Sequence, residues 1–339
     1  MENNIIQTYK LLKSLSFQRA TSDVMTPIDF ALKMVDSIPQ RLFNGRVLVP
    51  GSGYGTFAMA LIHKGWDPAM ITCIELDTAF ALVSQKYVGR QGVNVVKANF
   101  LTWQTNMQFD VVIGNPPYQN GKNSNYYVKF IERSAELLKD GGYFSYLIPN
   151  RFTLPHTPAA KTLRSLFQLG KLNANVSNWF PGVGTTIGWV TGSKSEGGHV
   201  GTTSMTLLDG TDIKYDPAKL VVPSKLANAE GVRGWSKIAQ LDSYEVTRRK
   251  PESGSYVFIR RQWRSKGGVI YLDAVVGDHP EGHTDGGYIL TDEPELVAEH
   301  LRGPVGVEIH KLFGDQMNLW PCLWQHLPTR QAWSKFTKA

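Results

Sequence analysis

The stretch "FDVVIGNPPYQN", residues 109–120, decides the fold, because it looks like a buried strand that stops at an Asn, two prolines and a Tyr. Residues 111–113 form a short β-branched run, which is typical of a strand covered on both faces of its sheet. Pro116 and Pro117 have no N–H to give to a neighbouring strand, so the strand must end before them. Asn-Pro also starts ordinary turns, and the rest of the chain has to show whether this corner carries chemistry.

Strand-like and helix-like patterns alternate through the first 200 residues. The expected strands are 46–50, 70–76, 93–99, 109–114 and 143–149, with two more between 171 and 191. The expected helices are 57–65, 78–88 and 127–142, the last ending at a Gly pair. This alternation predicts a Rossmann-like α/β fold with a mostly parallel, seven-stranded sheet and helices on its faces.

A second, smaller domain is expected after a joint at 192–204, "GSKSEGGHVGTTS", which is poor in apolar residues and rich in Gly and Ser. The first domain therefore spans 1–195 and the second 205–339. Short strand-like runs broken by Gly and Pro predict a mixed or β-rich second domain.

The composition is that of a folded protein with a sizeable core, with 339 residues of which 42% are hydrophobic. Cys73 and Cys322 lie far apart, which indicates a reducing compartment without disulfides or a zinc site. The N-terminus lacks a signal-peptide pattern, and no apolar run approaches the ~18 residues of a membrane span. We expect a cytoplasmic protein that needs neither a membrane nor a metal.

The net charge of +7 is unevenly distributed along the chain. Residues 1–200 hold 19 Lys and Arg against 12 Asp and Glu, whereas 201–339 hold 17 of each. Within the neutral half, 248–266 carries seven basic residues and one acidic, and 273–299 carries eight acidic residues and no basic one. This segregation predicts a stripe that faces a polyanion, with the acidic surface turned elsewhere; the alternative is a solvated face.

A glycine-rich loop, "VPGSGYGTF" at 49–57, separates the first strand from its helix. Gly51, Gly53 and Gly55 allow close approach of a ligand at the carboxyl edge of the sheet, although many such loops are only tight turns. Glu75 ends the next strand, 20 residues after Gly55, where a carboxylate can accept both hydroxyls of a ribose. Together they predict a cofactor that contains a nucleoside.

The Asn-Pro-Pro-Tyr corner suits methyl transfer to an amine on a flat ring. The amino group of adenine is a poor nucleophile, because its lone pair is delocalised into the ring. The side-chain oxygen of Asn115 and the carbonyl of Pro116 can draw that nitrogen towards tetrahedral geometry, and the prolines fix their direction in advance. Tyr118 offers a ring face on which the base can stack.

Residues 20–195 resemble the S-adenosylmethionine-dependent DNA adenine-N6 methyltransferases in which the cofactor loop precedes the Asn-Pro-Pro-Tyr motif. The resemblance is carried by Thr26-Pro27, the loop at 49–57, "NPPY", and "NWFPGVGTTIGWV" at 178–190. It implies S-adenosylmethionine as cofactor and Asn115, Pro116, Tyr118 and Phe180 as catalytic residues, with Phe180 opposite Tyr118 on a flipped adenine. The implied cofactor-binding residues are Thr26, Pro50, Gly51, Gly53, Gly55, Glu75, Asn99, Phe100, Asn115 and Pro117.

Two positions depart from the pattern of the family. Val49 stands where the loop usually begins with an acidic residue that orients loop amides or the cofactor's amino group. Asn99 replaces the usual Asp beside the cofactor's adenine, although its oxygen can still accept a hydrogen bond. We expect weaker cofactor binding without loss of activity.

The substrate depends on the second half of the chain, since enzymes with the same motif modify RNA adenine or a protein glutamine amide. The basic stretch 248–266 is interleaved with Tyr256, Phe258 and Trp263, which favours double-stranded DNA. The expected DNA-binding residues are Arg248, Arg249, Arg260, Arg261, Arg264 and Lys266. A restriction or specificity subunit is a candidate partner, and a cofactor-holding subunit that needs a partner to act is the alternative of another class.

Three further residues outside these motifs invite a chemical role, and we assign none to them. Pro321-Cys322 resembles the nucleophile dipeptide of cytosine methyltransferases but lies far from every cofactor motif, so Cys322 is expected in the core. His279 and His283 lack partners at metal-ligand spacing.

Overall fold

A computed structural model of the chain gives the fold. It describes residues 24–119, 125–153, 155, 157–181, 183, 185–207, 210, 212–218, 245–247, 250–266, 269–282, 286–291 and 294–302. The chain forms two compact units, the first made of Met1–Thr206 and Asp212–Ala218, the second of Leu207–Thr211 and Lys219–Ala339.

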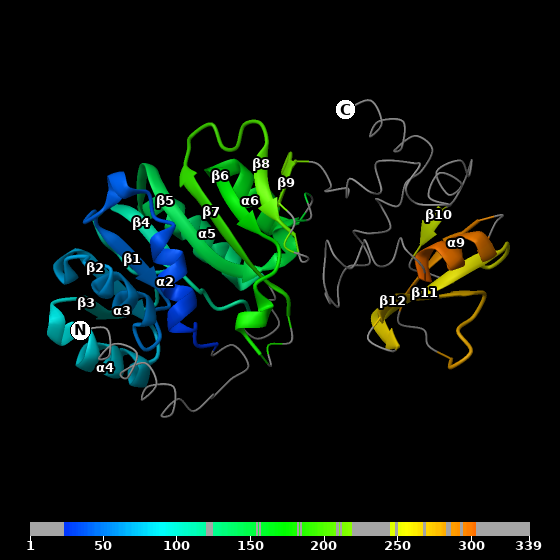
Figure 1. Ribbon diagram of the computed structural model, residues 1–339, viewed down its shortest axis with the longest axis horizontal. Helices are drawn as coiled ribbons and strands as arrows, with labels where there is room; N and C mark the ends of the chain where they lie inside the picture. The colour runs from blue at the N-terminus through cyan, green and yellow to red at the C-terminus, as the bar shows by residue number, and fades with distance from the viewer. Residues whose placement is uncertain are drawn as a thin grey trace. The chain divides into compact units, whose positions relative to one another are not determined.

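The first unit is built on one nine-stranded sheet (Figure 1). Its strands are β1 (Val47–Pro50), β2 (Ile71–Glu75), β3 (Asn94–Lys97), β4 (Phe109–Gly114), β5 (Leu138–Pro149), β6 (Phe167–Asn173), β7 (Ile187–Lys194), β8 (Thr203–Thr206) and β9 (Asp212–Tyr215). Their order is β3-β2-β1-β4-β5-β7-β6-β8-β9. β1 to β5 pair in parallel, and β7 runs antiparallel between β5 and β6. The predicted Rossmann-like, mostly parallel sheet is confirmed.

The described α-helices of this unit alternate with the strands along the chain, except α2, which precedes β1. They are α2 (Ile28–Asp36), α3 (Thr56–His63), α4 (Thr78–Tyr87), α5 (Tyr126–Leu137) and α6 (Pro158–Leu166). α2 packs beside α3, and α5 beside α6. The start of α4 is fixed by Asp77, whose carboxylate accepts hydrogen bonds from the N–H groups of Ala79 and Phe80. α3, the helix after the glycine loop, thus begins after the left-handed Gly55, whereas α4 begins at the carboxylate cap of Asp77.

Two expectations need correction, and the joint expected at 192–204 stays a prediction. The sheet has nine strands rather than seven, because β8 pairs with β6 and β9 pairs with β8. The helix expected at 127–142 ends at Leu137, and residues 138–142 begin β5, whose register against β4 shifts where Gly141 takes a φ of +71°. α6 had no sequence prediction.

The core explains why the central strands are nearly uninterrupted runs of apolar residues. All residues of β1 and β2 are buried, and five of the six in β4. α2 covers one side of this layer with Phe30 and Met34, which are 1% and 0% exposed. Burying a side chain of this size stabilises the fold by about 1.5–3 kcal/mol. The carboxyl edge of the sheet is therefore a rigid platform for the loops that follow β1, β2 and β4.

The second unit holds a four-stranded antiparallel sheet and one described helix. Its elements are β10 (Glu245–Thr247), β11 (Tyr256–Lys266), β12 (Val269–Val276), β13 (Gly286–Leu290) and α9 (Pro294–Arg302), with the order β10-β13-β11-β12. Three successive residues of β11, 257–259, are almost fully buried. A β-rich C-terminal region was expected, and the structure confirms it. None of the described helices is long and apolar enough to cross a bilayer.

Candidate active site

The predicted cofactor and catalytic motifs meet at one edge of the sheet. β1 lies between β2 and β4 and is parallel to both, and β3 is parallel to β2, so the four strands end on the same side. Pro50, Glu75 and Gly114 are the last residues of their strands, and Asn115 follows directly. This is the edge at which open α/β sheets bind small molecules.

The glycine loop is shaped by three left-handed residues. Gly51, Gly53 and Gly55 have φ angles of +62°, +54° and +87°, which a side chain would disfavour. A Cβ on Gly51 would lie 3.6 Å from Cδ of Pro117, so the loop packs against the Asn-Pro-Pro-Tyr corner. A Cβ on Gly53 would meet no atom within 4 Å, and this part of the loop has open space beside its backbone.

Glu75 holds the glycine loop through its carboxylate. Oε2 accepts a 2.7 Å hydrogen bond from the N–H of Gly53, and Oε1 accepts one of 2.8 Å from the N–H of Asp77. Burial raises the pKa of Glu75 above its usual value, although these two hydrogen bonds act in the opposite direction. Each oxygen keeps a second lone pair for a ligand hydroxyl. Val49 is buried in β1 and has no carboxylate to orient the loop amides, whereas Glu75 does orient one of them.

Leu76 is a candidate ligand contact that the sequence did not reveal. Its side chain is 62% exposed, although it directly follows the buried Glu75 at the carboxyl edge. An exposed leucine beside a ribose-binding carboxylate offers an apolar surface for a flat ring. The only signal in the sequence is its position at the end of β2. The open space at Gly53, the carboxylate of Glu75 and this apolar surface fit a nucleoside cofactor.

Asn99 and Phe100 form a tight turn after β3. Oδ1 of Asn99 accepts a 3.1 Å hydrogen bond from the N–H of Leu101, and Phe100 is 3% exposed. The rings of Phe100 and Phe130 on α5 lie 5.1 Å apart, centre to centre. The structure therefore places Phe100 in contact with α5, and its role towards the cofactor stays a prediction.

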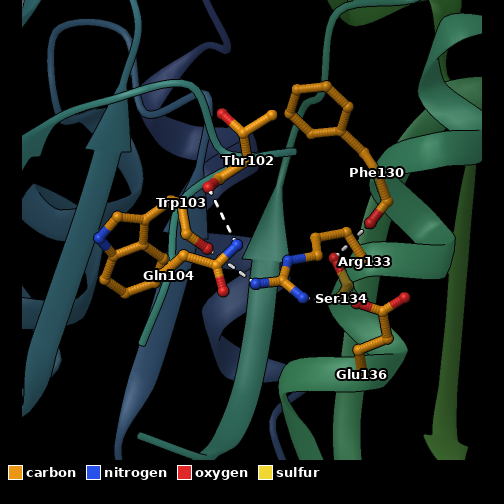
Figure 2. A network of polar contacts seen from close by, with 7 residues as sticks. All are labelled: Thr102, Trp103, Gln104, Phe130, Arg133, Ser134 and Glu136. Carbon is orange, nitrogen blue, oxygen red and sulfur yellow. Dashed lines mark hydrogen bonds and ion pairs between the residues drawn. The ribbon is translucent and has the colours of Figure 1, made fainter. Parts of the chain in front are cut away.

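A polar network fastens the end of this turn to α5. Figure 2 shows Arg133 reaching from α5 to the backbone of Trp103, whose carbonyl accepts a 2.7 Å hydrogen bond from Nη2 of Arg133. The same guanidinium pairs with Glu136 one turn further along the helix. Ser134 donates a 2.6 Å hydrogen bond to the carbonyl of Phe130. Arg133 thus fixes the loop that carries Asn99 and Phe100.

The amide of Asn115 is oriented by the segment before α2. Its Nδ2 donates to the carbonyl of Val24 and to Oγ1 of Thr26, both at 3.3 Å. A carbonyl can only accept a hydrogen bond, so this contact assigns the amide nitrogen to that side. Oδ1 then faces the other way, where it accepts a 2.9 Å hydrogen bond from the hydroxyl of Tyr118. Thr26, expected beside the cofactor, contacts the side-chain amide of Asn115.

The two aromatic residues expected to hold the base belong to one apolar cluster. Phe180 is 4% exposed and packs edge-on against Phe30, with ring centres 6.1 Å apart. Tyr118 packs, partly buried, against the same cluster. Pro116 is buried between Asn115 and Pro117. Asn115, Pro116 and Tyr118 are neighbours in the chain, Phe180 belongs to the cluster against which Tyr118 packs, and the roles of all four stay predictions.

Tyr127 and Arg151 extend this corner and were missed by sequence reasoning. Tyr127, on α5, is 1% exposed and meets the ring of Tyr118 edge to face, with centres 6.5 Å apart. Burial raises the pKa of Tyr127 to about 12, an effect that the charge of Arg151 opposes. Within the described part of the chain, the hydroxyl of Tyr127 has no hydrogen-bond partner. Tyr127 begins the helix predicted at 127–142 and Arg151 lies just after the strand predicted at 143–149, but sequence reasoning gave neither residue a role.

The basic stretch is described only in part. Arg248 and Arg249 lie outside the described residues, and of Arg261, Arg264 and Lys266 the backbone alone is described, in β11. The predicted separation of charges is wrong at two points. Nη1 of Arg260 lies 4.0 Å from Oδ2 of Asp273, and Nζ of Lys250 lies 2.6 Å from Oδ2 of Asp278. Asp273 lies on β12, which pairs with β11, so part of the acidic run adjoins the basic one.

His279 has a structural role in the second unit. Its Nδ1 accepts a 3.1 Å hydrogen bond from the N–H of Glu281, and its Nε2 lies 3.1 Å from Oδ2 of Asp273. No group of three metal-ligating side chains occurs among the described residues, and His283 and Cys322 fall outside them. Cys73 is buried in β2, and burial raises its pKa to about 12, which removes it as a thiolate nucleophile.

Known proteins resemble part of this chain. Residues 75–177 match the family described as Eco57I restriction-modification methylase. A tRNA1(Val) (adenine(37)-N6)-methyltransferase from Bacteroides thetaiotaomicron is 32% identical over 122 residues, which are 31% of this chain and 52% of the relative. The modification methylase CviBIII of Paramecium bursaria Chlorella virus NC1A is 30% identical over 117 residues, 31% of this chain and 30% of the relative. The matched part thus spans about half or less of these relatives.

Among solved structures, a type I restriction-modification methyltransferase subunit from Streptococcus thermophilus aligns with a TM-score of 0.45 and 16% identity. The alignment covers 61% of this chain and 53% of that one.

Proposed function

We propose, from the premise that this chain is a relative of the S-adenosylmethionine-dependent N6-adenine methyltransferases, that it methylates the 6-amino group of adenine in double-stranded DNA. The observation that carries the proposal is the orientation of Asn115. Its nitrogen is fixed by Val24 and Thr26, so its oxygen faces the corner where an amine has to bind. S-adenosylmethionine is the expected cofactor, and when bound it supplies an electrophilic methyl group.

The residues of the chain divide the remaining work. Oδ1 of Asn115 and the carbonyl of Pro116 each accept one hydrogen of the target amine, and the lone pair of the nitrogen is then left to point at the methyl group. Tyr118 and Phe180 hold the flipped base by stacking on its faces. Gly51 packs on Pro117, so that the loop expected to hold the cofactor and the corner expected to hold the amine are in direct contact. The methyl donor and the acceptor nitrogen are brought together by this contact.

Cofactor binding is assigned to the edge next to this corner. Glu75 accepts the ribose hydroxyls through its remaining lone pairs, and Leu76 offers its exposed side chain to the adenine of the cofactor. Gly53 leaves room beside its backbone for the rest of the molecule. Pro50, Asn99 and Phe100 complete the proposed set.

DNA is preferred over RNA for two reasons. The matched family consists of restriction-modification methylases, and the second unit carries the basic strand β11 expected to contact phosphates. A restriction or specificity subunit is the partner that the same match suggests. RNA adenine methylation is the second candidate, and it is favoured by the identity to a tRNA adenine-N6 methyltransferase. A protein glutamine amide has no observation in its favour, and a cofactor-holding subunit that needs a partner to act has only the departures at Val49 and Asn99.

The test is methyl transfer from tritiated S-adenosylmethionine to separate pools of unmethylated duplex DNA, RNA and protein, followed by digestion and identification of the labelled residue. We expect N6-methyladenine in DNA. Asn115→Ala should reduce transfer by about 100-fold or more, as removal of a preorganised polar group in a transition state typically does. The dissociation constant for the cofactor should stay nearly constant.

The exposed Asn106 provides the matched control, since Asn106→Ala removes the same amide from a surface position. It should leave transfer unchanged. Label in RNA alone would replace DNA as substrate, and an Asn115→Ala variant as active as the wild type would remove the amine-holding role.

A further inference from the structure

The hydroxyl of Tyr118 is hydrogen-bonded to Oδ1 of Asn115, the atom that should accept a hydrogen of the target amine in the proposed reaction. Oδ1 of Asn115 accepts the 2.9 Å hydrogen bond from this hydroxyl. A ring that donates to Oδ1 points its hydroxyl edge at that oxygen. Oδ1 has a second lone pair for the amine, but a ring turned edge-on to this oxygen does not lay its face on a base that binds there. Tyr118 therefore has to release Asn115 before the base can bind.

The hydroxyl of Tyr127 is buried at the same corner. The side chain is 1% exposed, and its hydroxyl has no hydrogen-bond partner within the described residues. A buried hydroxyl without a partner lowers the stability of a fold, and a phenylalanine would fill the same space without that penalty. The free hydroxyl is thus a feature for which the packing gives no reason.

The two tyrosines are in direct contact. Their rings meet edge to face, at an interplanar angle of 81° with centres 6.5 Å apart. Burial, and after it the neighbouring Tyr127, raises the pKa of the Tyr118 hydroxyl, so the two side chains also interact electrostatically. When Tyr118 leaves Asn115, the side chain of Tyr127 beside it has an unfilled hydrogen-bonding group.

We infer that Tyr127 is a positioning residue for the target base: its hydroxyl binds the hydroxyl of Tyr118 once Tyr118 has released Asn115, and this bond turns the ring of Tyr118 towards the base. The exchange is balanced, because Tyr118 gives up one hydrogen bond and gains another while Oδ1 of Asn115 becomes available to the amine. The inference rests on the proposed function and adds to it a residue that acts through Tyr118.

A double-mutant cycle tests the inference by methyl transfer to unmethylated duplex DNA, and to RNA in parallel. Tyr127→Phe should lower kcat about five- to tenfold, the effect of one hydrogen bond, and leave the KM for S-adenosylmethionine unchanged. A Tyr118→Phe background has no hydroxyl at position 118 for Tyr127 to bind. In this background Tyr127→Phe should have no further effect on kcat. Tyr126→Phe, the same change at the neighbouring half-buried position, is the matched control and should leave kcat unchanged.

Thermal unfolding gives a readout that does not depend on the substrate. Tyr127→Phe should keep or raise the melting temperature, because it removes no hydrogen bond, whereas Tyr118→Phe should lower it by removing the bond to Asn115. Equal losses of kcat for Tyr127→Phe in both backgrounds, an unchanged kcat in the wild-type background, or a lowered melting temperature would overturn the positioning role. A wild-type chain inactive on both DNA and RNA would instead overturn the proposed function.

Discussion

The N–H of Gly53 donates a 2.7 Å hydrogen bond to Oε2 of Glu75, which joins the glycine loop after β1 to the end of β2. The carboxylate therefore has two roles, since it shapes the loop and is the proposed acceptor for the ribose of the cofactor. The family that the sequence resembles usually has an acidic residue at the head of the loop, and here Val49 occupies that position. Substitutions at this edge should separate the two functions.

Cofactor affinity should depend on the ionisation of Glu75. Burial raises its pKa above the ordinary 4.5, so the folded protein takes up a proton at a higher pH than an exposed glutamate does. Protonation replaces an acceptor lone pair with an O–H group, and the affinity for S-adenosylmethionine should fall as the pH approaches 4.5 from above. Isothermal titration between pH 8 and 5 would measure the fall. Glu75→Gln should bind weakly at every pH and show no such dependence.

The raised pKa of Glu75 also determines how its contribution to stability changes with pH. Because the folded pKa is higher than the unfolded one, the folded state binds more protons between the two values. The contribution of Glu75 to stability is then fullest below pH 4.5 and is lost as the pH rises through the folded pKa. A glutamine is neutral like the protonated carboxyl group, so Glu75→Gln should change the free energy of unfolding less at low pH, where Glu75 is protonated, than at neutral pH.

Gly53 and Gly55 should respond differently to the same substitution. Both have positive φ, but a Cβ on Gly55 would lie 3.0 Å from Oγ of Ser84 and 3.1 Å from Cγ2 of Val88, whereas a Cβ on Gly53 would meet nothing within 4 Å. Gly55→Ala should lower the free energy of unfolding by about 2 kcal/mol or more, from backbone strain and overpacking. Gly53→Ala should cost about 1 kcal/mol and weaken cofactor binding more strongly, because its open space is the proposed site. Urea unfolding of both variants would measure the loss of stability, and cofactor titration would measure the loss of affinity.

The contact between Arg133 and Trp103 should support cofactor binding from a distance. Arg133→Ala removes a charged hydrogen bond to a backbone carbonyl, which is typically worth about 1.5–3 kcal/mol, and releases the turn that carries Asn99 and Phe100. We expect lower stability together with weaker cofactor binding. Glu136→Gln is the control, since it breaks only the exposed ion pair of the same guanidinium and should cost less than about 1 kcal/mol. Equal cofactor affinity in all three proteins would show that the turn does not depend on Arg133.

The sequence predicted the strands and motifs of this site well where the signal is local. The glycine loop, Glu75 and the Asn-Pro-Pro-Tyr corner are each marked by residue types within one short segment. The bond between Nδ2 of Asn115 and Oγ1 of Thr26 joins residues 89 positions apart, and no local pattern encodes it. The hydrogen bond from the hydroxyl of Tyr118 to Asn115 likewise depends on the rotamer of Tyr118, which the motif does not specify.

The sequence did not predict β8 and β9 at the far edge of the sheet for a related reason. β8 and β9 are only four residues long and follow a segment rich in Gly and Ser, which resembles a joint. β8 is placed by hydrogen bonds to β6, a partner about 30 residues earlier in the chain, and β9 is placed by its pairing with β8. The Gly pair at 141–142 shows the opposite error, because glycines that would end a helix here allow an irregular start of β5.

Binding of DNA through β11 should show in the salt dependence of the affinity. The double variant Arg261→Ala and Arg264→Ala should weaken binding to duplex DNA and reduce the slope of log K against log salt by about 2, close to one for each phosphate that is no longer neutralised. Lys250→Ala is the matched control, because its ammonium is already paired with Asp278 at 2.6 Å and should release few counterions. Fluorescence anisotropy at salt concentrations from about 50 to 200 mM, with a labelled duplex, would measure both slopes. A slope that stays the same in the double variant would mean that β11 does not face the nucleic acid.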